Sequence, residues 1–139
     1  MIRVAAAIAA VAVFLAAFGC GGSSDDEQLS KSEYVSKANS ICKKARQERQ
    51  QLLVKAGKDV TNIELLALLE TKSIPRYQQM VEELSKLGLP EGSEEQAEQA
   101  LAAMRKAGAE AKADYGKAGG SIVKADKEVE ALGLNECVF

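Results

Sequence analysis

Residues 119–137, GGSIVKADKEVEALGLNEC, decide how many helices the chain forms. The apolar residues Ile122, Ala125, Val129 and Leu132 continue the heptad spacing of the preceding segment, which favours one unbroken helix. The adjacent Gly119-Gly120 pair favours a break, because each glycine costs about 1 kcal/mol in a helix interior. The position that Cys137 must reach helps to choose between the two arrangements.

Residues 1–19 have the features of a secretory signal peptide. Arg3 precedes an unbroken apolar run over residues 4–18, and the small residue Gly19 ends that run. A membrane-spanning helix needs about 20 apolar residues, so an uncleaved anchor is the second interpretation. We expect the signal to direct the chain out of the cytoplasm.

The residues around the expected cut, Ala17-Phe18-Gly19-Cys20, resemble a bacterial lipobox. In that motif a Cys follows a small residue, is linked to diacylglycerol and becomes the new N-terminus. The resemblance implies a lipidated Cys20 and a lipid anchor on the extracytoplasmic face of the cell membrane. Residues 20–29 then form a flexible acidic tether, and residues 30–139 form a helical bundle domain.

The chain contains three Cys, and an odd number in an exported protein needs an explanation. If Cys20 carries lipid, Cys42 and Cys137 are left as a pair, and an exported compartment permits that pair to form a disulfide. The alternative is that both are free, buried thiols that act as small apolar side chains.

A Cys42–Cys137 disulfide favours four helices over three. At 1.5 Å per residue, Cys42 lies roughly 21 Å from the end of the first helix, and a helix over residues 121–132 runs back about 18 Å from the same end. Cys137 then reaches the level of Cys42. We predict an all-α fold: an antiparallel up-down-up-down four-helix bundle with a break at Gly119-Gly120, or alternatively near Asp114.

The first helix is predicted to begin at Ser30, where Ser30 and Glu33 have capping-box spacing, and to end at Gly57. Residues at helical spacing form its inward face. These residues are Tyr34, Ala38, Ile41, Ala45, Leu52 and Ala56.

The second helix is predicted to begin at Thr61, with Glu64 completing another capping box. Its first turns are apolar on nearly all sides, so we expect them to be the most buried segment. Pro75 predicts a kink, with Ser73 as a new cap, because proline lacks the amide hydrogen that a helix interior uses. The third helix is predicted to start near Ser93. Its apolar stripe is Ala97, Leu101, Met104, Gly108, Ala111, Tyr115 and Ala118.

Two short patterns resemble small uncharacterised actinobacterial lipoproteins with a lipobox-type signal. One is the early Tyr34, Ala38, Ile41 and Cys42 pattern, and the other is the closing Leu-Gly-Leu-x-x-Cys of residues 132–137. Such proteins have an Ala-rich helical domain with one early and one late Cys. The resemblance implies a cell-envelope location and a Cys42–Cys137 pair, and it brings no activity.

The amino-acid composition provides few of the side chains that enzymes use for catalysis. There is no His, which removes the commonest general base and metal ligand, and 18 Lys and Arg against 20 Asp and Glu leave a net charge of −2. Neighbouring carboxylates such as Glu82-Glu83 and Glu94-Glu95 point to different helix faces. We expect no enzyme, no metal, no cofactor and no nucleic-acid partner.

A basic run, Lys43, Lys44, Arg46 and Arg49, is interleaved with Gln and Glu and has no aromatic companions. This pattern is typical of a solvated helix face.

The sequence therefore predicts a membrane-anchored lipoprotein whose domain is a non-enzymatic binding or scaffolding module of the cell envelope. The alternative is a small-molecule or lipid binder that uses a slot between helices, where the small residues Gly108 and Ala111 face Tyr77 or Met80. An internal apolar cavity of about 300 Å³ or more would favour the alternative, and a closed core would favour a protein partner.

Overall fold

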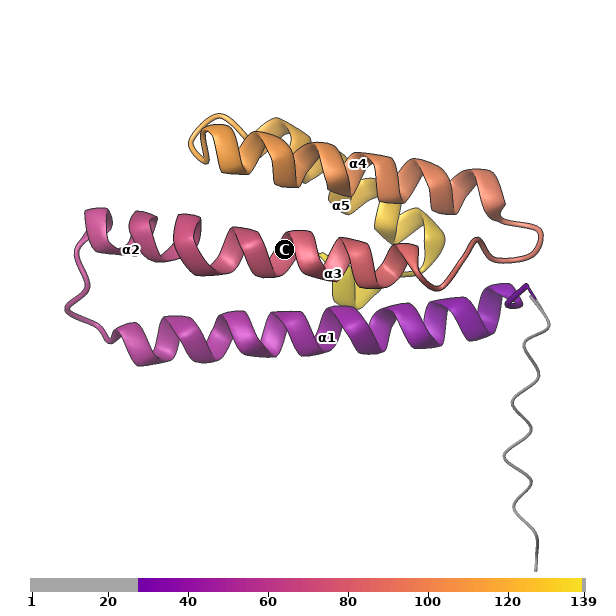
Figure 1. Ribbon diagram of the computed structural model, residues 1–139, viewed down its shortest axis with the longest axis horizontal. Helices are drawn as coiled ribbons and strands as arrows, with labels where there is room; N and C mark the ends of the chain where they lie inside the picture. Colours follow the sequence, from indigo (N-terminus) through magenta and orange to yellow (C-terminus); the bar gives the residue numbers. More distant parts are fainter. Residues whose placement is uncertain (1–27, 139) are drawn as a thin grey trace, which may run out of the picture.

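The computed structural model describes residues 28–138, and every regular element in that range is a helix (Figure 1). The predicted all-α class is confirmed. The elements are α1 (Lys31–Ala56), α2 (Asn62–Leu68), the π-helical turn η1 (Leu69–Ser73), α3 (Ile74–Ser85), α4 (Glu94–Ala113), α5 (Gly119–Leu132) and the 3₁₀ turn η2 (Asn135–Cys137). The predicted signal peptide, Cys20 and the tether up to residue 27 lie outside the described residues.

Both predicted capping boxes are present. The Ser30 backbone amide donates to Glu33 Oε2 at 3.1 Å, and the Glu33 amide donates to Ser30 Oγ at 3.4 Å. Thr61 and Glu64 repeat the arrangement at the start of α2, at 2.9 and 3.3 Å. Each box satisfies amides that the first helical turn leaves without backbone partners. The hydrogen bonds from the caps lower the pKa of the Glu33 and Glu64 carboxyls.

The expectation that the start of the second helix is the most buried segment is wrong. No residue of α2 is buried, and Ile63 is 81% exposed. Figure 1 shows the cause: the α1–α2 end of the molecule extends past the end of α4, so no further helix covers it. Apolar residues on all sides of a helix predict burial only where neighbouring helices are long enough to surround it.

The chain stays helical through Pro75. The amide of Ile74 donates to Leu69 O, five residues back, which makes η1 a π-helical turn directly before the proline. Ser73 has helical angles, φ −72° and ψ −45°, and makes no side-chain capping bond, so its predicted role as a cap is wrong. A π turn is a local adjustment of the helix ladder, and here it occurs where proline cannot supply an amide hydrogen.

The helix break lies earlier than Gly119-Gly120, and that choice is corrected in favour of the alternative near Asp114. Helix α4 ends at Ala113, and Asp114 is extended with φ −161° and ψ 98°. The Lys117 amide donates to Asp114 O at 3.1 Å, and Lys117 Nζ lies 2.8 Å from Asp114 Oδ2. The two glycines begin α5, where unpaired amides are already present and glycine costs less than in a helix interior.

The end of α5 is a Schellman motif at Gly133, which has φ +90°. The amide of Leu134 donates to Val129 O at 2.8 Å, and the amide of Gly133 donates to Glu130 O at 2.9 Å. Leu134 and Val129 are both buried in the main core. This turn reverses the chain and directs η2 toward α1.

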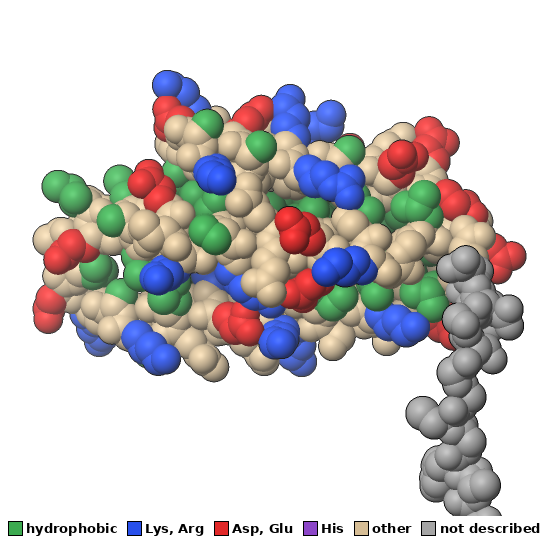
Figure 2. Space-filling model, viewed as in Figure 1, with side chains coloured by type: hydrophobic (Ala, Val, Ile, Leu, Met, Phe, Trp, Pro, Cys, Tyr) green, Lys and Arg blue, Asp and Glu red, His purple; other side chains and the backbone are tan. Residues whose placement is uncertain are grey.

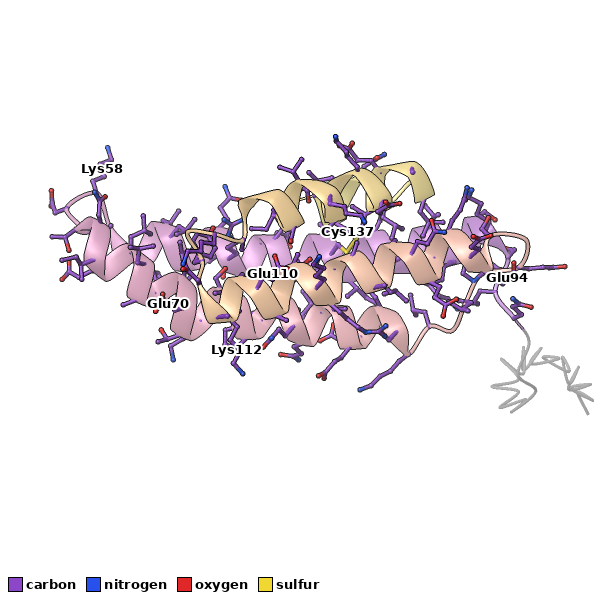
Figure 3. All side chains as sticks on the ribbon, turned by 90° about the horizontal axis from the view of Figure 1, so that it is seen from above. Lys58, Glu70, Glu94, Glu110, Lys112 and Cys137 are labelled. Carbon is purple, nitrogen blue, oxygen red and sulfur yellow. A yellow bond between two sulfur atoms is a disulfide. The ribbon has the colours of Figure 1, made fainter. Side chains whose placement is uncertain are left out.

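The structure brings Cys42 of α1 and Cys137 of η2 to disulfide distance, with their Cα atoms 4.8 Å apart across 95 residues of sequence (Figure 3). Both are fully buried. One turn of α1 before Cys42, Asn39 Nδ2 donates to Gly133 O at 3.1 Å, and Asn39 Oδ1 accepts from the Glu136 amide at 2.9 Å. Arg46 forms an ion pair with Glu136. We call these contacts between α1 and η2 the C-terminal latch.

Replacing both cysteines, Cys42→Ala with Cys137→Ala, is expected to lower the free energy of unfolding by about 4–5 kcal/mol on the chain-entropy model for so long a loop. Urea unfolding followed by circular dichroism measures the change. A reducing agent should destabilise the wild type and leave the double variant unaffected. Equal stability of wild type and variant under oxidising conditions would show that the bond does not contribute.

Candidate functional site

The predicted interhelical slot is present but small. Its cavity has a volume of about 80 Å³. Gly108 and Ala111 of α4 line it together with Tyr77 of α3, as the sequence predicted, whereas Met80 is fully buried elsewhere in the core. The remaining lining residues are Arg49, Ser73, Ile74, Ala107, Tyr115, Ile122 and Asp126.

Gly108 makes the close packing at this slot possible. A Cβ atom at position 108 would lie 3.1 Å from Tyr77 Cδ1 and 3.2 Å from Cε1, closer than ordinary van der Waals contact. The Tyr77 ring therefore packs directly on the backbone of α4. The missing side chain admits an aromatic ring of the protein itself, which leaves little room for a ligand.

Charged groups of both signs reach the slot. Arg49 comes from α1 and Asp126 from α5, and both of these residues and Tyr77 interact with neighbouring groups. Burial raises the pKa of the Tyr77 hydroxyl, and the negative charge of Asp126 raises it further. Ligand pockets usually have volumes of about 300–1,000 Å³. At about 80 Å³ the slot favours a closed core over a small-molecule site.

A larger hollow, of about 330 Å³, lies on the surface between α4 and α5. It is open to solvent rather than enclosed between helices, and therefore it is not the internal apolar cavity that would indicate a lipid or drug-sized ligand. The lining residues are Gln99, Ala102, Ala103, Lys106, Ser121, Lys124 and Glu128.

Tyr34 lies in the main core with no exposed surface, and its hydroxyl has no hydrogen-bond partner among the described residues. The sequence predicted that Tyr34 lies on the inward face of the first helix, and its burial confirms this. Burial raises the pKa of this hydroxyl. A buried hydroxyl without a partner costs about 1–3 kcal/mol, so this residue opposes stability in part while its ring contributes to the core.

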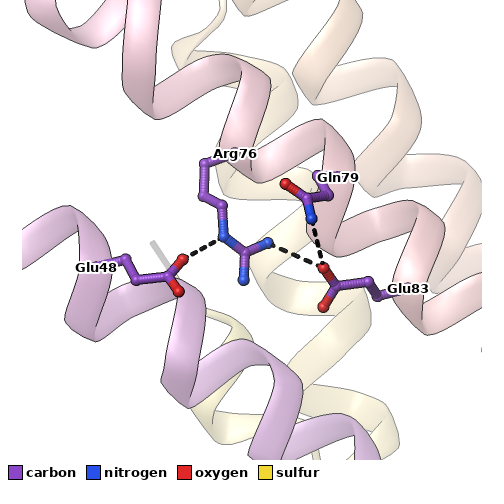
Figure 4. A network of polar contacts seen from close by, with 4 residues as sticks. All are labelled: Glu48, Arg76, Gln79 and Glu83. Atoms are coloured by element: carbon purple, nitrogen blue, oxygen red, sulfur yellow. Dashed lines mark hydrogen bonds and ion pairs between the residues drawn. The ribbon is translucent and has the colours of Figure 1, made fainter.

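Glu83 and Glu94, two of the acidic residues noted in the sequence, have structural partners. Arg76 of α3, with 18% of its side chain exposed, forms ion pairs with Glu48 of α1 and, at 3.5 Å, with Glu83 (Figure 4). Gln79 Nε2 also donates to Glu83 Oε1 at 3.0 Å. Hydrogen bonds from backbone amides, including that of Gly92, lower the pKa of Glu94. Within residues 28–138 no group of three acidic or Cys side chains is placed to hold a metal ion.

The four basic residues of the run on α1 have different environments in the structure. Arg46 pairs with Glu136 in the C-terminal latch, and Arg49 lines the slot. Lys43 and Lys44 are exposed, and neither forms an ion pair with another described residue.

Three large apolar side chains are exposed at the α1–α2 end, and we call them the apolar tip (Figure 2). They are Val54 at 74%, Ile63 at 81% and Leu66 at 45% exposure. The opposite end of the molecule holds the chain entry, where the Glu91 amide donates to Leu29 O at 2.8 Å. Single exposed apolar residues are common, and these three share one end of the molecule, which makes that end a candidate interaction surface.

The apolar tip was not predicted from the sequence, because the expected break at Gly119-Gly120 makes the third helix nearly as long as the first. The first helical segment was predicted to run from Ser30 to Gly57, and α1 has 26 residues against 20 in α4 and 14 in α5. At 1.5 Å per residue α1 exceeds α4 by about 9 Å, so the end of the first hairpin has no helix to cover it.

Comparisons with known proteins identify no relative. No family model matches the chain, and no curated protein or solved structure matches it significantly. Among the described residues, no helix combines the length and apolar character needed to cross a membrane.

The packing at Gly108 can be tested against Gly120, where a Cβ atom would have nothing within 4 Å. We expect Gly120→Ala to raise the free energy of unfolding by about 0.5–1 kcal/mol through helix propensity. Gly108→Ala is expected to lower it by about 1 kcal/mol, because crowding against Tyr77 outweighs the same gain. Chemical unfolding of both variants measures the difference. Equal stabilisation by both would mean that the Tyr77 ring has room to move away.

Proposed function

We propose that the chain is a lipid-anchored lipoprotein on the extracytoplasmic face of the cell membrane. In this proposal its helical domain is a non-enzymatic binding or scaffolding module for another envelope component. The diacylglycerol is attached to Cys20, and residues 20–29 tether the domain. The proposed partners are the membrane, through this lipid, and an envelope protein; nucleic acid is not one of them.

The different positions of the three cysteines support the proposed lipid anchor. Cys42 and Cys137 lie at disulfide distance and are fully buried, so neither is accessible for another modification. Cys20 is the remaining Cys, and it directly follows the signal-like residues 1–19. A disulfide in a small domain also fits an oxidising compartment.

The observation that carries the binding role is the apolar tip. Val54, Ile63 and Leu66 are exposed at the end of the domain opposite the chain entry at Leu29. Helix α1 separates the two ends by about 39 Å at 1.5 Å per residue. A lipid at one end and an apolar surface at the other suit a protein that positions a partner at a set distance from its anchor. The small slot supports this role over that of a ligand binder, because its volume of about 80 Å³ is well below that of usual ligand sites.

We also propose that the helices form an antiparallel up-down-up-down bundle in which α2, η1 and α3 together are the second member, kinked at Pro75. The packing of α1 on α3, α3 on α4 and α4 on α5 supports this order. The π turn η1 directly before Pro75 supports a change of helix direction there.

Intact mass of the protein purified from its native membrane tests the anchor. We expect the signal residues to be absent, a diacylglycerol-containing adduct to be present on Cys20, and two hydrogens to be missing for the Cys42–Cys137 bond. Cys20→Ser should remove the adduct and release the protein from the membrane. An unmodified Cys20 in membrane-derived protein would overturn the proposed anchor.

Substitution of Ile63 tests the binding role, and Val123 on α5, 55% exposed, provides the matched control. Ile63→Asp and Val123→Asp should each change the free energy of unfolding by less than about 0.5 kcal/mol, because both sites are exposed. A photoreactive residue at position 66 in native cells should give a discrete crosslinked product that Ile63→Asp removes and Val123→Asp leaves. No discrete product, or equal loss in both variants, would contradict binding through the tip.

A further inference from the structure

The outer face of α1 is opposite to its buried residues Tyr34, Ala38, Cys42 and Ala45. It carries four lysines and no carboxylate from Ser36 onward. Its exposed members are Ser36, Lys37, Ser40, Lys43, Lys44, Gln47, Gln50, Gln51, Val54 and Lys55. We propose that this face lies on an anionic phospholipid surface, the membrane to which Cys20 is proposed to be anchored. This inference rests on the proposed function and assigns it a membrane-facing side.

The charge of α1 differs from that of the rest of the chain. Seven of the chain's 18 Lys and Arg but only two of its 20 Asp and Glu lie on this helix. The remainder of the protein is acidic, so α1 is the element whose charge best fits an anionic surface.

Both carboxylates of α1 are exposed, but each already has a partner within the fold. Glu33 is held in the capping box by Ser30, and Glu48 pairs with Arg76 of α3 (Figure 4). Arg46 in turn neutralises Glu136 in the C-terminal latch. The ion pairs of α1 are thus made toward other elements, while Lys43, Lys44 and Lys55 form none with described residues. Figure 2 shows Lys and Arg side chains along the edge of the molecule occupied by α1.

Other exposed surfaces do not share this arrangement. On α4, Lys106 Nζ lies 3.7 Å from Glu110 Oε1. The first turn of α4 also carries Glu94 and Glu95. On the α4–α5 connection, Lys117 pairs with Asp114. Mixed charge of this kind offers an anionic surface no net attraction.

The tether length permits this contact. A chain between Cys20 and Lys31 spans at most about 36 Å when extended, and a flexible one of this length averages roughly 17 Å. The start of α1 therefore lies within about 36 Å of the headgroups once Cys20 is anchored, close enough for the contact to form. With α1 against the lipid, α4 faces away from the membrane, because it lies beyond α3 from α1 (Figure 1).

Lysine labelling of the full lipidated protein in vesicles tests this orientation. The vesicles contain phosphatidylcholine alone or mixed with phosphatidylglycerol, and an amine-reactive reagent that does not cross membranes is read out by mass spectrometry. On the mixed vesicles we expect Lys43 and Lys44 to react at least about fivefold more slowly, since each lysine at an anionic surface contributes about that factor to binding. About 1 M salt should restore the rate. The exposed Lys112 and Lys124, on α4 and α5, should react equally on both vesicles.

A charge-reversal pair provides the control variants. Lys43→Glu with Lys44→Glu should remove the protection of Lys55, whereas Lys112→Glu with Lys124→Glu makes the same change in net charge and should leave Lys43 and Lys44 protected. Flotation of the same samples reports anchoring separately. Protein that floats with the vesicles but shows equal labelling of both lysine groups would overturn the inference and leave the anchor intact. Protein that does not float would overturn the proposed anchor itself.

Discussion

The C-terminal latch joins the middle of α1 to the end of the described chain, and the arrangement of the helices depends on it. Asn39, Cys42 and Arg46 lie three or four residues apart on one face of α1, and each contacts η2 or the glycine turn before it. The Asn39 side chain donates a hydrogen bond to Gly133 O and accepts one from the Glu136 amide. It therefore satisfies two backbone groups that the chain reversal would leave unpaired. The Schellman turn at Gly133 directs η2 toward α1, and the disulfide fixes the distance between η2 and α1. Together they hold the short α5 against the core made by α1, α3 and α4.

The composition of α4 explains why such a cross-link matters. Its buried residues include Ala97, Ala100, Ala107, Gly108 and Ala111, with Leu101 and Met104 as the large members. Small side chains allow close approach of neighbouring helices but remove little apolar surface from water, and burial contributes about 25 cal/mol per Å². A domain of this size with an alanine-rich seam gains less from its core than one packed with leucine. Restricting the unfolded chain through a 95-residue loop adds stability without adding core volume.

The sequence predicted most reliably the features that are determined locally. The capping boxes at Ser30 and Thr61 depend on a few neighbouring residues, and both are found where they were expected. Features that depend on the relative lengths of distant helices were not predicted. Exposure of α2 follows from the shorter α4. Not every local feature was predicted either, because the turn contacts of Asp114 with Lys117 end α4 earlier than the propensity of Gly119 and Gly120 suggests. For the slot, the sequence placed Tyr77 beside Gly108, but the volume that remains is set by ring packing and only the structure gives it.

The same difference in helix length relates the fold to the proposed role. The hairpin of α1 and α2 exposes Val54, Ile63 and Leu66, and apolar side chains left in water contribute nothing to the stability of the domain itself. Loss of those residues to polar ones would cost the fold little, because no core residue depends on them. The lysines of the outer face of α1 are likewise dispensable for folding, since Lys43 and Lys44 form no ion pair within the described chain. Two surfaces thus lack a structural reason, the apolar one at the α1–α2 end and the basic one along α1. A partner at the tip and lipid headgroups along the side of α1 would provide a reason for each.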